Sequence, residues 1–176
     1  MANEIKAVIE LEDGREIKLK LYPEIAPITV KNFVGLCANN FYDGLCFHRV
    51  IPDFMVQGGG FTDKNGKLVE KHAPKTIRGE FRLNGVDNPL SHKPGVISMA
   101  RTSVPDSASS QFFICTADCK FLDGQYAAFG ECEDKESTNI AIGISAVDTH
   151  SVDYFDDVPV KPVIIKTIKI TENAAD

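Results

Sequence analysis

The sequence contains no long run of apolar residues. No stretch approaches the roughly 18 residues that a membrane-spanning helix requires. The opening Met-Ala-Asn-Glu-Ile-Lys also has an acid at Glu4, where a signal peptide would begin its apolar region. We therefore expect a soluble, unsecreted protein with no membrane partner.

Basic residues are also few. The 19 Lys and Arg residues stand against 25 Asp and Glu residues, so the formal net charge is -6. A general affinity for nucleic acid or anionic lipid needs a positive face to meet the phosphates. We therefore expect no nucleic-acid partner. The net charge does not exclude local basic patches on the surface.

The cysteines show no pairing pattern. There are five, at Cys37, Cys46, Cys115, Cys119 and Cys132, an odd number without a Cys-x-x-Cys pair. This argues against a disulfide framework or a zinc knuckle and favours small buried hydrophobes in a reducing cytoplasm. The spacing of Cys115 and Cys119 raises a redox alternative, but no second ligand pair supports it. We expect no metal and no cofactor.

The opening residues alternate as a strand does. With 176 residues and 43% hydrophobic content, the chain is expected to form a single domain over residues 1–176. Residues 5–11 place apolar side chains at odd positions, with Val8 as the only misfit, and residues 17–21 alternate likewise. Asp13-Gly14 between them is a strong hairpin signal. The sequence therefore predicts an antiparallel hairpin.

Two segments have helical periodicity. The first begins at Pro27, which suits a first helical position, and ends near Asn39 and Asn40. Its apolar stripe consists of Val30, Phe33, Val34 and Cys37. The second, weaker candidate begins around Asn139 and contains Gly143 in its interior.

Short apolar runs between turn-forming clusters indicate further strands. They cover residues 46–51, 54–57, 96–101, 112–117 and 127–131. In the last segment the apolar parity changes between Ile165 and Ile168, which indicates a β-bulge. Residues 61–94 show little periodicity and are expected to be long surface loops.

About eight strands and two helices result. An antiparallel sheet of this size removes its edges by stacking on another sheet or by closing on itself. We expect a mainly β fold, a closed eight-stranded antiparallel β-barrel capped by two α-helices.

The segment most informative about function is Phe-His-Arg-Val-Ile-Pro-Asp-Phe-Met-Val-Gln-Gly-Gly-Gly, residues 47–60. It sets Arg49 and Gln57 among apolar side chains, where burial of a charge is costly. Two more blocks follow. One runs from Gly-Val-Ile-Ser-Met-Ala-Arg-Thr through Gln-Phe-Phe-Ile-Cys-Thr-Ala, and the other is Phe-Leu-Asp-Gly-Gln-Tyr-Ala-Ala-Phe-Gly, residues 121–130.

In their motifs, order and spacing, these blocks closely resemble the cyclophilin-type peptidyl-prolyl cis-trans isomerases. The resemblance covers nearly the whole chain, and the style of the blocks is similar to the bacterial cytoplasmic branch. It implies an enzyme that accelerates rotation about Xaa-Pro bonds in polypeptides, assists protein folding and needs no cofactor. It also implies a substrate cleft on the outer surface of the barrel, and we expect a monomer.

The resemblance also assigns roles to residues. Arg49 corresponds to the catalytic arginine. The walls of the proline pocket correspond to Phe54, Met55, Phe113 and Leu122. The groups that hold the peptide correspond to Gln57, Ala100, Arg101 and Gln111.

Three positions depart from the pattern common in the family. Phe121 replaces a Trp whose indole donates a hydrogen bond to cyclosporin, so cyclosporin is expected to bind with reduced affinity. Tyr126 replaces a pocket histidine and cannot become cationic near neutral pH. Arg101 replaces an asparagine and is expected to change the preference for residues before proline.

Arg49 suits this reaction for a physical reason. Amide resonance gives a rotational barrier of roughly 18 to 20 kcal/mol. A guanidinium directed at the proline nitrogen interacts weakly with the planar amide and strongly with the twisted one, whose lone pair is localised.

Other interpretations stay open at this stage. Arg49 could be the structural partner of an acid such as Asp53, and the apolar residues around it could be ordinary core. His48 is expected to be packed rather than a ligand, and Gly58-Gly59-Gly60 to form a tight turn rather than a phosphate loop. A module that binds proline segments without turnover, or a general chaperone, remains an alternative to the enzyme.

Overall fold

The predicted opening hairpin is the first element of a large curled sheet. In a computed structural model that describes residues 5–173, β1 (Ile5–Leu11) pairs with β2 (Glu16–Leu21), with Ile9 opposite Ile17. The odd-numbered residues of β1 are buried and the even-numbered ones lie partly exposed. The alternating pattern therefore sets which face of the sheet meets the core.

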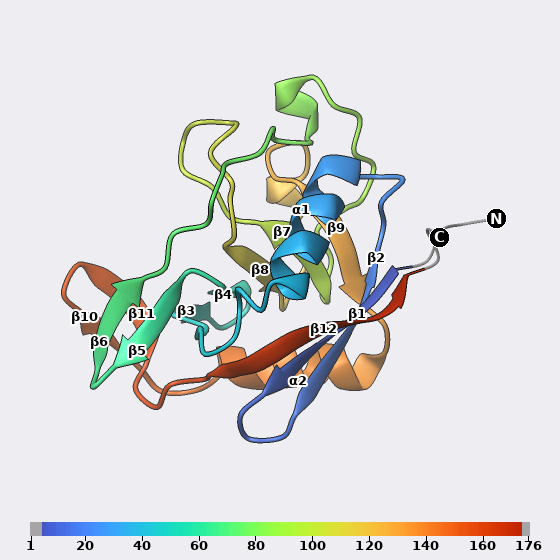
Figure 1. The fold of residues 1–176 in the computed structure, drawn as a ribbon. Coiled ribbons are helices and arrows are strands. Elements are labelled where there is room, and N and C mark those ends of the chain that lie inside the picture. The colour runs from blue at the N-terminus through green and yellow to red at the C-terminus, as the bar shows by residue number, and fades with distance from the viewer. Residues whose placement is uncertain (1–4, 174–176) are drawn as a thin grey trace.

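Eight strands form this sheet, in the order β12-β1-β2-β9-β7-β8-β4-β3, and all pairs are antiparallel. Two separate two-stranded sheets pair β5 with β6 and β10 with β11 (Figure 1). The remaining strands are β3 (Arg49–Ile51), β4 (Met55–Gly58), β5 (Phe61–Lys64), β6 (Lys67–Glu70), β7 (Val96–Met99), β8 (Phe112–Cys115), β9 (Ala128–Cys132), β10 (Thr149–Val152), β11 (Phe155–Pro159) and β12 (Ile165–Asn173).

The mainly β fold with two helices is confirmed, but the full closure of the barrel is wrong. The two end strands, β12 and β3, do not pair with each other along their length. The gap is narrowed by an irregular segment, in which a single bridge joins Cys46 to Ile164 and Phe47 N–H donates to Val163 O at 3.0 Å. β3 has only three residues, so it is too short to complete the ladder.

The two α-helices cover opposite ends of the curled sheet (Figure 1). α1 (Pro27–Ala38) has the predicted bounds and buries Val30, Phe33 and Cys37. It has no local side-chain cap. Instead Thr29 N–H and Thr29 Oγ1 both donate to the buried Glu80 carboxylate, at 2.6 and 2.8 Å, and so satisfy a free amide of the first turn.

α2 (Lys135–Ser145) begins four residues before the predicted start. Asp134 is its N-cap and accepts a hydrogen bond from Ser137 N–H at 2.8 Å. Asp is a preferred N-cap residue because its carboxylate satisfies a free amide of the first turn. The Asp134-x-x-Ser137 spacing was the signal that would have placed the start correctly.

The expected loop over residues 61–94 is wrong in its first part. There β5 and β6 form a hairpin around Asn65 and Gly66, whose φ values are +54° and +84°. Asn-Gly is the preferred pair for a two-residue hairpin turn that needs positive φ at both positions. Gly58 ends β4, residues 59–60 bend between β4 and β5, and the bulge near Ile165 is confirmed by a register shift against β1.

The cysteines are free within the described part of the chain. All but Cys132 are buried, as expected for small apolar residues. Burial raises the pKa of the Cys46 thiol to about 12 and that of Cys132 to about 11. In addition, none of the helices within residues 5–173 is both long and apolar enough to cross a bilayer.

Candidate active site

The predicted catalytic residue lies on a row of side chains that crosses the outer face of the sheet. Arg49 on β3 is opposite Gln57 on β4, Gln57 is opposite Phe113 on β8, and Phe113 is opposite Ser98 on β7. Directly opposed residues project to the same face of an antiparallel sheet. The register therefore places the guanidinium and the amide of one hairpin beside an aromatic ring that comes from a strand far along the chain.

A second apolar cluster forms on this outer face. The four residues of β8 are all buried, because their side chains alternate between the main core and a separate cluster. The buried members of the outer cluster are Met55, Phe113, Cys115, Cys119 and Leu122. The segment that carries Leu122 covers the outer face of the sheet at β8. Both faces of this antiparallel strand are therefore buried, and its sequence is a continuous apolar run.

Ten of the eleven predicted site residues line one pocket of about 380 Å³. Met55 and Phe113 rise from strands β4 and β8, and Leu122 comes from the 3₁₀ turn η2 (Lys120–Leu122). Phe54 lies at the turn before β4, and Tyr126 precedes β9 and meets Phe113 edge-on, with ring centroids 5.6 Å apart. The other five are Arg49, Gln57, Ala100, Arg101 and Gln111.

Arg49 lies exposed at this pocket and has little else to hold it. Its Nη1 donates to Gln57 Oε1 at a long 3.3 Å. Within residues 5–173, Arg49 has no carboxylate at ion-pairing distance. Asp53, the acid that the alternative interpretation named, does not pair with it either. The structure therefore contradicts the alternative that Arg49 is half of a structural ion pair.

Gln57 and Gln111 continue the polar edge of the pocket. Gln57 Nε2 donates to Gln111 Oε1 at 3.0 Å, so the two amides orient each other. Gln111 lies against Gly60. A Cβ added at position 60 would lie 2.4 Å from the Cγ of Gln111. Real Cβ atoms do not approach so closely, so a glycine at position 60 leaves room for this side chain.

Arg101 is engaged in a way that the sequence did not indicate. Its guanidinium lies between the rings of Phe81 and Tyr126, 4.7 Å from each ring centroid. Its Nε and Nη2 donate to Gln125 O at 3.0 and 2.5 Å, and Nη1 donates to Thr102 O at 2.9 Å. Arg101 therefore holds Tyr126 in the pocket wall.

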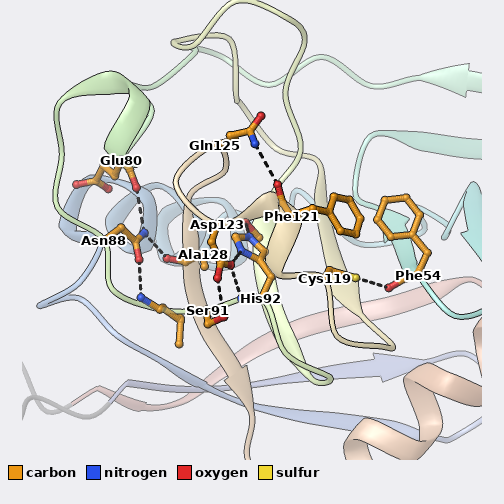
Figure 2. A network of polar contacts seen from close by, with 12 residues as sticks. Phe54, Glu80, Asn88, Ser91, His92, Cys119, Phe121, Asp123, Gln125 and Ala128 are labelled. Carbon is orange, nitrogen blue, oxygen red and sulfur yellow. Dashed lines mark hydrogen bonds and ion pairs between the residues drawn. The ribbon is translucent and has the colours of Figure 1, made fainter.

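Phe121 is the one predicted residue that does not line the pocket. Its ring is 64% exposed and lies beside Phe54, with centroids 5.7 Å apart. A phenyl ring offers no hydrogen-bond donor, unlike the indole of the Trp that Phe121 replaces in the resemblance described above. Figure 2 shows the rings of Phe121 and Phe54 beside each other.

Three aromatic residues extend the pocket beyond the predicted set. His48, Phe61 and Phe155 line it, and the His48 ring lies 4.6 Å from Phe61 and 6.3 Å from Phe155 between centroids. Phe61 begins β5 and Phe155 begins β11, so both come from the hairpins outside the main sheet. Their sequence separation left no local signal, and only the packing of the two hairpins brings them here.

His48 is packed, as predicted, and is 4% exposed. Its Nδ1 is buried without a hydrogen-bond partner among the described residues. Burial lowers the pKa of His48 to about 4, and the neighbouring Arg49 charge adds to this shift. The imidazole is therefore neutral near pH 7.

The described residues offer no group of three or more His, Cys, Asp or Glu side chains that could hold a metal ion. The pocket instead combines apolar walls, two mutually bonded amides and two guanidiniums, of which Arg101 is bonded to backbone carbonyls and Arg49 makes only a long hydrogen bond. Such a cleft suits the class of proteins that bind an extended peptide through an apolar side chain and a few oriented polar groups.

Comparison with known proteins gives the particular family. A model described as "Cyclophilin type peptidyl-prolyl cis-trans isomerase/CLD" matches residues 7–170. Peptidyl-prolyl cis-trans isomerase A of Dickeya dadantii is 45% identical over 159 residues, 88% of this chain and 78% of the relative. Peptidyl-prolyl cis-trans isomerase B of Escherichia coli is 36% identical over 165 residues, 89% of this chain and 94% of the relative.

Solved structures agree. A cyclophilin-type isomerase of Cryptosporidium parvum superposes with a TM-score of 0.74 and 28% identity, covering 97% of this chain and 99% of the other. A structure of the same protein in the presence of the dipeptide Ala-Pro gives a TM-score of 0.72. The chain belongs to the cyclophilin-type family and is a peptidyl-prolyl cis-trans isomerase.

Proposed function

We propose that this isomerase turns Xaa-Pro bonds in the cleft beside Arg49, with Arg49 as its catalytic residue. The observation that supports this most is the state of the guanidinium. It lies at the edge of an apolar pocket, has one long hydrogen bond and has no carboxylate partner within residues 5–173. A group kept free of structural contacts is available to a substrate.

The proline ring would rest against the apolar walls formed by Phe54, Met55, Phe113 and Leu122. In the planar amide, resonance places partial charges on oxygen and nitrogen, and this dipole shrinks as the bond twists. An apolar surrounding therefore disfavours the planar state relative to the twisted one. The walls lower the barrier by this difference and also hold the ring in place.

The guanidinium of Arg49 would donate to the proline nitrogen as the bond leaves the plane. There the nitrogen regains its lone pair, so the interaction is stronger in the transition state than in either planar isomer. Unassisted exchange takes tens to hundreds of seconds. Reaching about 10³ s⁻¹ requires a barrier lower by roughly 6 kcal/mol, which the arginine and the apolar walls would share.

Gln57 and Gln111 would hold the peptide on one side of the turning bond. Their amides orient each other at 3.0 Å, so the groups that face the substrate have a fixed direction. Ala100 lies next to them, because its N–H donates to Gln111 O at 2.9 Å. Holding one side while the other turns converts binding into rotation of a single bond.

The test is protease-coupled isomerisation of a short Ala-Pro-Phe peptide by wild type, Arg49→Ala and the control Arg15→Ala. Arg15 is also exposed, but pairs with Asp13 in the first hairpin turn. We expect Arg49→Ala to lose about 10² to 10³-fold in kcat/KM, the loss typical of removing one transition-state donor. Arg15→Ala should keep the wild-type rate, and equal rates in all three proteins would remove Arg49 from the mechanism.

We further propose proline-containing polypeptides in the cytoplasm as substrates, with assistance to folding as the purpose. A single domain over residues 1–176, acting as a monomer, would suffice, because every group that lines the pocket comes from one chain. Cyclosporin would bind with reduced affinity, since Phe121 offers no donor. The bacterial relatives and the Ala-Pro structure support the choice of substrate.

A further inference from the structure

A buried histidine, His92, lies directly behind the aromatic floor of the pocket. It is 0% exposed and does not line the cavity. Its ring stacks on Phe113, with centroids 6.0 Å apart and planes 16° apart, while Tyr126 meets Phe113 edge-on. The phenyl ring that faces the substrate is therefore set by one ring behind it and one beside it.

Two polar contacts fix the plane of the His92 ring. Its Nδ1 lies 2.8 Å from Asp123 Oδ1 and its Nε2 lies 2.9 Å from Ser98 Oγ. A carboxylate can only accept, so Nδ1 carries the proton and Nε2 accepts from the serine hydroxyl. Burial lowers the pKa of His92 although Asp123 acts in the opposite direction, which keeps the ring neutral near pH 7.

The same histidine ties two parts of the pocket together. Ser98 on β7 is the cross-strand partner of Phe113 on β8, whereas Asp123, which Figure 2 shows beside His92, follows directly after Leu122. The backbone adds two more links to the Leu122 segment. His92 N–H donates to Asp123 Oδ1 at 2.7 Å, and Cys119 N–H donates to His92 O at 2.8 Å.

Asp123 is itself held in place from a third direction. Ser91 Oγ donates to its Oδ2 at 2.6 Å, while Oδ1 takes both contacts from His92. These hydrogen bonds lower the pKa of Asp123 although partial burial opposes them, so the carboxylate stays ionised and accepts. Both ends of the His92 ring therefore meet partners whose own positions are fixed.

We propose that His92 is a positioning residue of the isomerase, which fixes the placement of Phe113 relative to Leu122 and so the shape of the proline pocket. This inference rests on the proposed assignment of Phe113 and Leu122 to that pocket. His92 touches no substrate. It acts through the ring in front of it and through the segment to which it is bonded.

The contacts Ser98–His92–Asp123 also follow the order of a hydrolase triad, but the arrangement does not fit that reaction. Ser98 and His92 are both 0% exposed, and the Ser98 hydroxyl lies beneath the layer that contains Phe113. A nucleophile must reach a carbonyl carbon next to a site for the oxyanion. A closed set of contacts fixes a ring and offers no place for an acyl group.

The positioning role predicts a split between KM and kcat. A misplaced Phe113 leaves the surroundings of the turning bond apolar but weakens contact with the proline ring in the planar and twisted states alike, so binding is lost uniformly and KM rises while kcat holds. His92→Asn keeps a donor near Nδ1 but loses the stacked ring and the Ser98 contact. We expect a rise in KM of about five to tenfold with kcat within twofold.

A matched control separates positioning from general loss of stability. Ser137→Ala removes another buried serine, whose Oγ accepts from Lys18 N–H at 2.9 Å and which does not line the pocket. It should lower the unfolding temperature and leave KM unchanged. Ser98→Ala is the milder second variant, in case His92→Asn does not fold, and should raise KM about twofold.

The experiment measures kcat, KM and the unfolding temperature for these three variants and for Phe113→Ala, with the same Ala-Pro-Phe peptide. The positioning role of His92 is supported if the KM of the His92 or Ser98 variant rises more than the KM of Ser137→Ala while their unfolding temperatures are similar. The positioning role would be overturned by KM values of the His92 and Ser98 variants equal to the KM of Ser137→Ala. Labelling of Ser98 in the wild type by a fluorophosphonate probe would overturn it as well. Unchanged KM in Phe113→Ala would instead show that the proposed pocket is wrong.

Discussion

Two arginines border the same pocket, and their surroundings differ completely. Arg101 lies between two aromatic rings and donates three hydrogen bonds to backbone carbonyls. Arg49 is exposed and makes one long hydrogen bond to Gln57. Both side chains carry the same charge and the same planar donor set.

The difference teaches which contacts mark a structural group and which mark a reacting one. A guanidinium that lies between two rings and donates three of its five N–H groups to the backbone is held in one place, and it stabilises the parts that it joins. A guanidinium with unused donors at an apolar cavity keeps them for a bound molecule. We therefore expect substitutions at Arg49 to change the rate, and substitutions at Arg101 to change stability and binding.

The largest expected contrast comes from replacing each arginine by lysine. Arg49→Lys should lose roughly 10²-fold in kcat, because an ammonium on a flexible stem holds its direction poorly. Arg101→Lys should keep kcat within twofold and raise KM about threefold as Tyr126 loosens. The protease-coupled assay gives both values, and similar kcat losses in the two variants would break the comparison.

A pH series sharpens the contrast through His48, which lies next to Arg49. The pKa of His48 is about 4 in the folded chain, below its ordinary value near 6.5. The unfolded chain therefore binds a proton that the folded chain refuses, so stability falls as the pH drops from 6.5 toward 4. At about 1.4 kcal/mol per pH unit, the loss approaches ~3 kcal/mol.

Urea unfolding of wild type and His48→Phe from pH 7 to 4 isolates this contribution, because other acid-sensitive groups are common to both. An NMR titration of the His48 ring in the arginine variants then tests how the charge of each arginine affects the pKa of His48. Arg49→Ala should raise its pKa, since the Arg49 charge is one cause of the shift, and Arg101→Ala should not. A His48 pKa near 6.5 in the wild type would contradict the buried neutral ring.

A smaller effect is expected on stability itself. Arg101→Ala removes two cation–π contacts and three hydrogen bonds, and should lower the free energy of unfolding by about 2 kcal/mol. Arg49→Ala should change it by less than about 0.5 kcal/mol, as for a free surface residue. Chemical denaturation measures both, and an equal loss in the two variants would show that Arg49 is structural after all.

The smallest effect concerns two aromatic residues that differ as the two arginines do. Tyr126 is held in place by Arg101, whereas Phe121 is exposed. Phe121→Trp should leave the unfolding temperature unchanged and strengthen inhibition by cyclosporin about fivefold, because the indole adds one hydrogen-bond donor worth about 1 kcal/mol. Inhibition curves of the two proteins provide the measurement. Unchanged inhibition would mean that another position limits the affinity for the drug.

The sequence predicts best where structure is local. The hairpin at residues 5–21 and the helix from Pro27 follow from periodicity and turn residues alone. The hairpin at Asn65-Gly66 also had a clear local signal, which the lack of periodicity around it obscured. The prediction of full closure was wrong because closure depends on the pairing of the end strands β3 and β12, and a sequence pattern gives the bounds of a strand poorly.

The candidate site was predicted through family motifs rather than through physics. Periodicity alone would place Met55 and Phe113 in the core, because both faces of their strands are buried. Local pattern also gives no hint of Phe155 or His92, which reach the pocket region through pairings across more than 20 residues of chain. Contacts of this kind are set by packing, and a single sequence does not reveal them.

The site is built on the outer face of the curled sheet, while the opposite face packs against the main core. A peptide bound at this candidate site would meet the protein from the side, and no chain end would have to be threaded through a channel. A proline in the middle of a long chain would then be as accessible as one in a short peptide. The main core would not have to open for such binding, so the substrate chain could be far larger than the enzyme.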